Sequence, residues 1–150
     1  MLKQDLKEEL KKSMMDRNEL RTSVMRMLLS AINYYEIQKG GANYEATDTD
    51  IMSVIQTQIK QRKDSIESFE KAGRRELADK EKKEMEMLQV YLPPQLSEEE
   101  ITQLVNDAIA QTGAKSIAEI GKVMGFLMPK TKNKADGNLV SKIVKEKLAQ

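Results

Sequence analysis

Two adjacent prolines, Pro93 and Pro94, set the strongest constraint on how this chain can fold. Proline has no N–H to donate, and it excludes the preceding residue from the α region, so no helix can run through this point. Apolar side chains recur at helical spacing on both sides of the two prolines. The pattern predicts a hinge between two helical domains, residues 1–92 and residues 96–150.

The N-terminal domain is predicted to contain four helices. Asp16 is expected to be the N-cap of the second, with Glu19 completing a capping box, and Thr47 or Asp48 is expected to cap the third. The predicted helices span roughly residues 2–16, 17–40, 50–72 and 74–92. The side chains expected to face the core from the first two helices are Leu2, Leu6, Leu10, Met14, Leu20, Val24, Met27, Leu28, Ala31 and Tyr35.

The C-terminal domain is predicted to contain three helices. Ser97 and Glu100 form a capping box for the first, Ser116 caps a shorter second helix that Pro129 ends, and the last begins near Asp136. The fold predicted for the whole chain is therefore all-α, with a four-helix domain and a small three-helix domain joined at the Pro-Pro hinge.

Composition excludes most catalytic chemistry. The chain has no Cys and no His, which removes thiol nucleophiles, imidazole bases and nearly all zinc or haem sites. No phosphate loop or dinucleotide fingerprint is present. Ser68 and Lys71 match S-x-x-K, but the match is short and we interpret it as chance. We expect no catalytic residues, no metal site and no cofactor.

The apolar runs are too short for a transmembrane helix, so no membrane partner is expected. The first ten residues mix acids and bases, unlike a signal or transit peptide. These two features predict a cytoplasmic protein. The sequence does not indicate the oligomeric state.

Positive charge gathers near the C-terminus, where residues 120–150 carry seven lysines against two acids. If Pro129 ends a helix, then Lys130, Lys132 and Lys134 share one exposed turn, and their ammonium groups repel one another unless an anion is near. The N–H groups that follow the Asp136 cap offer another anion site. The flanking lysines that can reinforce the turn are Lys122, Lys142 and Lys145.

Gly121 and Gly125 lie four positions apart, on one face of the predicted helix. Each costs about 1 kcal/mol relative to Ala in a helix interior, so something must compensate. Close approach of a neighbouring helix is the favoured interpretation, and approach of a ligand backbone is the alternative.

The segment "QIKQRKDSI", residues 58–66, places Lys60 and Lys63 on one helix face and Arg62 nearer the apolar side. The favoured interpretation pairs Arg62 with an acid from a neighbouring helix, and phosphate contact by this segment is the alternative. Glu84 and Glu86 are interpreted as part of a solvated face.

Four blocks, in order, resemble the YqeY family of small helical proteins: "LKQDLKEELKKSM", "QIKQRKDSIESFEKAGR", "EMEMLQVYLPPQLSEEEI" and "IGKVMGFLMPKTKNKADGNLVSKIV". Residues 120–148 also resemble the tail domain of the B subunit of the tRNA-dependent glutamine amidotransferase. That resemblance implies RNA contact by the tail. Carbon–nitrogen ligase activity with glutamine as amido-N-donor is implied by family relation only.

One position departs from the family pattern, in which the turn reads K-G-K-A-D-G. This chain has Asn133 where the family has glycine, followed by Asp136 and Gly137. Because Asn tolerates positive φ better than other non-glycine residues, the left-handed turn is expected to survive.

The leading functional hypothesis is an accessory RNA-binding protein, with tRNA as the first candidate and no catalytic centre of its own. Its contacts are expected from Lys122, Lys130, Lys132, Lys134, Lys142, Lys145, Lys60 and Lys63. One alternative is a helical interaction module that docks on a translation-related enzyme through the second or third helix. The other is an autonomous ligase.

Overall fold

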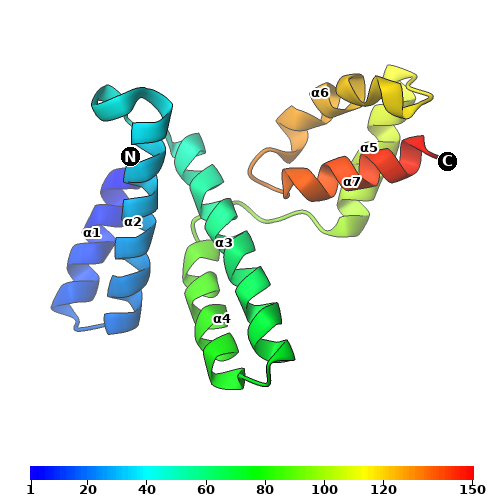
Figure 1. Cartoon of the computed structure of the whole chain (residues 1–150). Coiled ribbons are helices and arrows are strands. Elements are labelled where there is room, and N and C mark those ends of the chain that lie inside the picture. Colours follow the sequence, from blue (N-terminus) through cyan, green and yellow to red (C-terminus); the bar gives the residue numbers. More distant parts are fainter. The chain divides into compact units, whose positions relative to one another are not determined.

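The computed structural model describes residues 1–150 and contains seven α-helices, two short 3-10 helices and no β-strand (Figure 1). The prediction of an all-α fold is confirmed. The chain divides into two compact units, which we call unit 1 (Met1–Leu92) and unit 2 (Pro93–Gln150).

Unit 1 is built from two helical hairpins. Short connections at residues 16–18 and 72–74 join the helices within each hairpin, and α3 and α4 share the most extensive helix contact. The elements are α1 (Leu2–Met15), α2 (Glu19–Gly40), η1 (Gly41–Asn43), α3 (Asp48–Lys71) and α4 (Arg75–Gln89).

The core of unit 1 is aliphatic. Its buried side chains include Leu6, Val24, Met25, Leu28, Ile32, Ile51, Val54, Ile55, Ile59 and Leu88. The prediction is wrong for two core residues, because Met14 and Met27 are half-exposed. Met25 and Ile32 are buried instead, since α2 contacts α1, α3 and α4 together and turns a different face inward.

The N-cap predicted for the second helix is wrong. Asp16 is the C-cap of α1, and Asn18 caps α2 by accepting a hydrogen bond from the backbone N–H of Arg21 at 3.1 Å. Between them, Arg17 adopts a left-handed φ of 55°. This residue ends one helix and delays the next, so the capping box with Glu19 does not form.

The start of α3 is fixed by Asp50. Thr47 and Asp50 form a reciprocal capping box, and Asp50 also accepts hydrogen bonds from the hydroxyls of Tyr35 at 2.9 Å and Tyr44 at 2.6 Å. Because these donors favour the carboxylate, the pKa of Asp50 is lowered, with the Tyr44 bond as the largest cause. The same bond raises the pKa of Tyr44 to about 12.

We predict that Asp50 makes unit 1 acid-sensitive. A carboxyl whose pKa is lowered by folding contributes stability above its unfolded pKa of about 3.9, and this contribution is lost as the pH falls below that value. The difference between the urea midpoints of the wild type and Asp50→Asn should therefore be largest near neutral pH and shrink progressively as the pH falls below about 4. A gap that stays constant across this range would contradict the role of the Asp50 charge.

Arg62 is buried between α3 and α4, with 6% of its surface exposed. Its Nη1 makes a short ion pair with Glu84 and a second one with Glu81 at 3.1 Å, both from α4. The prediction that Arg62 pairs with an acid of a neighbouring helix is thus confirmed. Glu84 is not part of a solvated face as predicted, because Arg62 draws it inward.

Removal of Arg62 is expected to destabilise the protein strongly. Arg62→Met leaves Glu84 buried without its partner, which should lower the free energy of unfolding by about 3 kcal/mol in urea titrations. Arg62→Met/Glu84→Met should recover most of that loss. The matched control is Lys82→Met, which breaks the half-exposed pair with Glu70 and should cost less than about 1 kcal/mol. Equal losses for Arg62→Met and Lys82→Met would refute this assignment.

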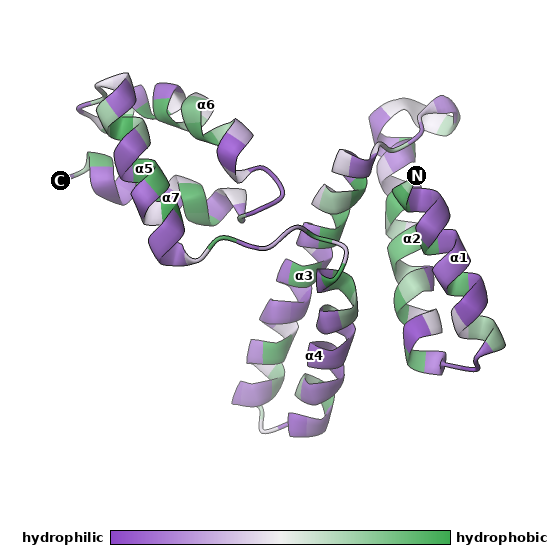
Figure 2. Cartoon of the chain, turned by 180° about the vertical axis from the view of Figure 1, so that it is seen from behind, coloured by the Kyte–Doolittle hydropathy of each residue, from purple (hydrophilic) through white to green (hydrophobic).

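Unit 2 consists of three helices, each of which packs on the other two. They are α5 (Glu98–Thr112), α6 (Ile120–Thr131) and α7 (Gly137–Leu148), with the 3-10 turn η2 (Ile117–Glu119) before α6. Figure 2 shows their apolar residues as green segments between purple ones. The core includes Ile101, Val105, Ala108, Val123, Leu127, Val140, Ile143 and Val144.

Three capping predictions for unit 2 have different outcomes. Ser97 and Glu100 form the predicted capping box of α5. Ser116 makes no side-chain cap. Pro129 does not end α6, which continues to Thr131. A proline in the last turn removes only one helical hydrogen bond, and the N–H of Lys132 still reaches the carbonyl of Met128 at 3.0 Å.

Candidate nucleic-acid interface

The segment between α6 and α7 is held by backbone hydrogen bonds. The N–H groups of Lys134 and Ala135 donate to the carbonyl of Thr131 at 2.9 Å and 3.1 Å. The Thr131 hydroxyl is buried and donates to the carbonyl of Leu127 at 3.1 Å. The turn that follows α6 is therefore tied to the last residue of that helix.

Asn133 adopts a φ of 62°, which confirms the predicted left-handed turn. Its carbonyl accepts a hydrogen bond from the side-chain amide of Gln95 at 3.0 Å, and the next carbonyl, of Lys134, accepts from the N–H of Leu96 at 2.8 Å. Residues directly after Pro94 thus brace the turn from outside. Sequence reasoning missed this brace, because backbone acceptors leave no signature in the residue types.

The three lysines of the predicted turn occupy different local structures. Lys130 is in the last turn of α6, Lys132 is the C-cap, and Lys134 follows Asn133. The prediction that all three share one turn beyond the helix is therefore wrong, because α6 passes through Pro129. All three are exposed.

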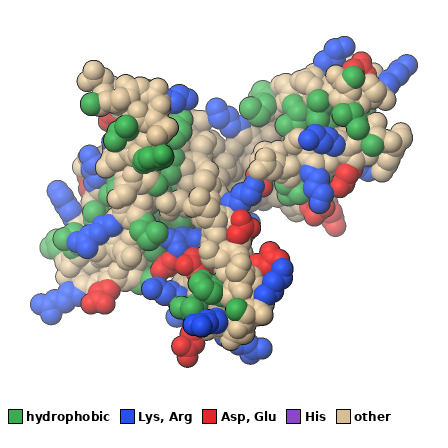
Figure 3. All heavy atoms as spheres, viewed as in Figure 1, with side chains coloured by type: hydrophobic (Ala, Val, Ile, Leu, Met, Phe, Trp, Pro, Cys, Tyr) green, Lys and Arg blue, Asp and Glu red, His purple; other side chains and the backbone are tan.

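Only one of these three ammonium groups has a partner within the chain. Lys130 Nζ lies 4.3 Å from the centroid of the Phe126 ring. Lys132 and Lys134 make no ion pair, so their charge faces solvent. Figure 3 shows Lys and Arg side chains spread over the molecule among acids, so the candidate depends on this local geometry rather than on a large basic patch.

The other predicted lysines contribute unequally. Lys122 lies 3.8 Å from Glu119, which offsets part of its charge. Lys142 and Lys145 are exposed on α7, three positions apart and hence on neighbouring parts of one face. Lys60 and Lys63 belong to α3 of unit 1, so they are not part of this surface of unit 2.

The N-terminus of α7 is already occupied by a side chain. Asp136 accepts a hydrogen bond from the N–H of Asn138 at 3.1 Å. An acidic cap satisfies a free N–H group and adds negative charge, so this helix end attracts an anion less than an uncapped end would. The predicted anion site at α7 is weaker than expected, and the lysines remain the main attraction.

The packing predicted for the glycines is wrong. A Cβ added at Gly121 or Gly125 would meet no atom within 4 Å, and both residues are exposed. The helix packs through Val123 and Leu127, which point to the opposite side of α6. A Cβ at Gly137 would also meet nothing within 4 Å, so none of these glycines is required by a neighbouring element.

No group of three or more acidic side chains lies close enough to hold a metal ion, and no helix is long and apolar enough to cross a membrane. The S-x-x-K match gains no support. Lys71 pairs with Glu67 at 2.8 Å, and this hydrogen bond raises the pKa of Lys71, which keeps the amine protonated and unsuited to act as a base.

Together, these features define a class of small all-α proteins with a hairpin-built N-terminal unit and a lysine-bearing three-helix unit. The chain belongs to the YqeY-like protein family, whose profile matches residues 3–148.

Its curated relatives carry the name "Altered inheritance of mitochondria protein 41, mitochondrial". The protein from Lachancea thermotolerans is 38% identical over 71% of this chain and 57% of its own length. The one from Pyrenophora tritici-repentis is 39% identical over 67% and 56%. The one from Saccharomyces cerevisiae YJM789 is 34% identical over 80% and 66%. The chain thus spans little more than half the length of the first two.

These relatives overturn one prediction. All three are named as mitochondrial proteins, so the prediction of a cytoplasmic protein is wrong. That prediction relied on the short apolar runs and on the mixed charge of the first ten residues, and neither feature identifies the compartment of the folded protein.

Substitutions at Asn133 should test the geometry of the turn. Asn133→Gly should leave the free energy of unfolding within about 0.5 kcal/mol of the wild type, because glycine reaches positive φ without strain. Asn133→Val should lower it by about 2 kcal/mol, because a β-branched residue is strained in the left-handed region. Urea unfolding monitored by circular dichroism measures both. Comparable stability of the Val and Gly variants would contradict the left-handed assignment.

Proposed function

We propose that the protein is an accessory RNA-binding protein, with tRNA as its first candidate ligand, and that the α6–α7 turn makes the main contact. The observation that carries the proposal is the pair Lys132 and Lys134, exposed and without an acid partner on a braced backbone. Unpaired charges on a fixed turn lose little side-chain and backbone freedom when they meet phosphates.

Recognition is expected to depend on shape and charge. Unit 2 has a single aromatic residue, Phe126, and Lys130 already covers its ring. Unit 2 therefore has no free aromatic side chain to stack on an unpaired base, which is the usual route to sequence-specific RNA recognition. Phosphate contacts position a protein without reading sequence. A folded RNA with closely spaced phosphates fits this surface better than an extended strand.

The proposal does not include catalysis. The resemblance to the amidotransferase subunit concerns its tail, and the turn described above offers charges and no nucleophile paired with a base. The protein would present or hold RNA for an enzyme that performs the chemistry.

Salt dependence gives the sharpest test. With three phosphate contacts, a plot of log Kd against log salt concentration should have a slope of roughly two to three. The Kd near physiological salt should be on the order of micromolar. Combined substitution of Lys130, Lys132 and Lys134 by Gln should remove about two units of that slope. Fluorescence anisotropy with labelled tRNA across a salt series measures it.

The matched control removes the same charge from unit 1. The exposed lysines of unit 1 suited to this control are Lys11, Lys80 and Lys83, each replaced by Gln. This variant should keep the wild-type slope. An equal loss of slope in both variants would show that only the net charge of the protein matters, which contradicts the proposed interface. An unchanged slope in the turn variant would refute it as well. An unstructured RNA of equal length should bind more weakly than tRNA.

A further inference from the structure

The solvent-facing side of α2 is unusually poor in charge. Between Ser23 and Gln38, α2 exposes eight side chains, and only Arg26 among them is charged, in a chain of which 33% is charged. The other exposed charges of α2, Glu19 and Lys39, lie near the two ends of the helix. A solvated helix face normally carries most of the charges of its helix. Figure 2 shows the contrast between the green segments of α2 and the largely purple α4. We call these eight residues the α2 face: Ser23, Arg26, Met27, Ser30, Asn33, Tyr34, Ile37 and Gln38.

Three large hydrophobic side chains project from this face. Met27 is 52% exposed, Tyr34 65% and Ile37 64%, and Figure 3 shows hydrophobic side chains on the surface of the α1–α2 pair. They contribute nothing to the core of unit 1. Exposed apolar side chains in a row along one helix are typical of a surface that another molecule covers.

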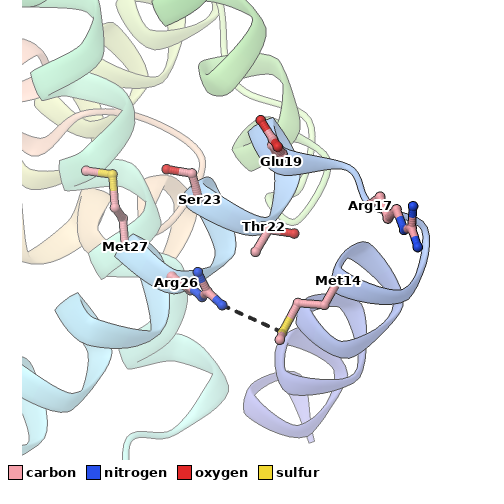
Figure 4. Close-up of a pocket in the computed structure, with 7 residues that line it drawn as sticks. All are labelled: Met14, Arg17, Glu19, Thr22, Ser23, Arg26 and Met27. Carbon is pink, nitrogen blue, oxygen red and sulfur yellow. Dashed lines mark hydrogen bonds between the residues drawn. The ribbon is translucent and has the colours of Figure 1, made fainter.

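The N-terminal end of the α2 face is hollowed. A groove lies there between α1 and α2, and Figure 4 shows Met14, Ser23, Arg26 and Met27 around it. Arg26 reaches across the groove, and its Nη2 lies 4.0 Å from the sulfur of Met14 instead of pairing with a carboxylate. Methionine side chains adapt easily to an inserted group, and a guanidinium without an acid partner can stack on an aromatic ring.

The large exposed side chains and the residues that line the groove lie at equal distances in sequence on either side of Ser30. Tyr34 and Arg26 are four positions to either side of it, and Ile37 and Ser23 are seven positions to either side. If two copies of α2 cross antiparallel at Ser30, each Tyr34 meets the partner's Arg26 and each Ile37 meets the partner's Ser23. The only charge on the face then meets an aromatic ring, and no like charges oppose each other.

We propose that the α2 face is a self-association surface, on which a second copy of this chain packs antiparallel about a two-fold axis at Ser30. The small side chains of Ser23 and Ser30 allow the helices to approach closely. The α2 face is about 24 Å long, which is short for a standard interface of about 800 Å² per partner. The dimer should therefore be weak, with a Kd on the order of 10 µM.

The geometry can be tested by disulfide formation in the full chain. Because the chain contains no Cys, Ser30→Cys introduces a single thiol at the proposed axis, where the two thiols would face each other. Mild oxidation should give a covalent dimer rapidly. Lys80→Cys, exposed on α4, is the matched control and should cross-link far more slowly. Similar rates for the two variants would overturn the two-fold axis.

Sedimentation velocity tests the association itself. The wild type should pass from monomer to dimer as concentration rises to about ten times the Kd. Ser30→Glu brings two carboxylates together at the axis, so its Kd should rise about a hundredfold. Lys80→Glu should leave the Kd unchanged. A wild type that stays monomeric at all concentrations would overturn the proposal, and the α2 face would then be assigned to a different protein partner. A dimer whose Kd is unaffected by Ser30→Glu would also overturn it.

Discussion

The buried ion pair between Arg62 and Glu84 is the interaction on which the register of unit 1 depends. Leucine, isoleucine and methionine side chains between helices accept small sliding movements, because apolar contacts have little directional preference. A guanidinium that must meet a carboxylate in a dry environment has no such freedom. The pair therefore fixes how α4 lies along α3, and α3 in turn supports both α1 and α2.

The unusual surface of unit 1 is apolar, whereas that of unit 2 is charged. In unit 1 the exceptional surface is the α2 face, where exposed Met27, Tyr34 and Ile37 replace the expected charges. In unit 2 it is a turn where Lys132 and Lys134 keep charge without compensation. An apolar face suits association between proteins, and uncompensated ammonium groups suit an anion. The two proposals thus rest on different physical properties of the two units.

Local signals predicted much of this structure from sequence. Apolar spacing gave the seven helices, and the left-handed turn at Asn133 followed from a single substitution in the family pattern. Errors arose where tertiary contacts decide. Glu84 was predicted to be solvated, but its ion pair with Arg62 holds it in the interior. Gly121 was predicted to pack against a neighbouring helix, but α6 packs through its other side. The α2 face escaped notice because exposure of Met27 depends on which neighbours the helix meets.

The brace from Gln95 and Leu96 changes where the C-terminal module begins. Measured by helices alone, the module would start at Glu98. A fragment cut there would keep every helix of unit 2 and every lysine, yet it would lose both hydrogen bonds to the carbonyls of Asn133 and Lys134. The transferable piece of this protein is thus defined by an irregular stretch that contains no helix, and any graft of the lysine turn onto another scaffold must carry that stretch with it.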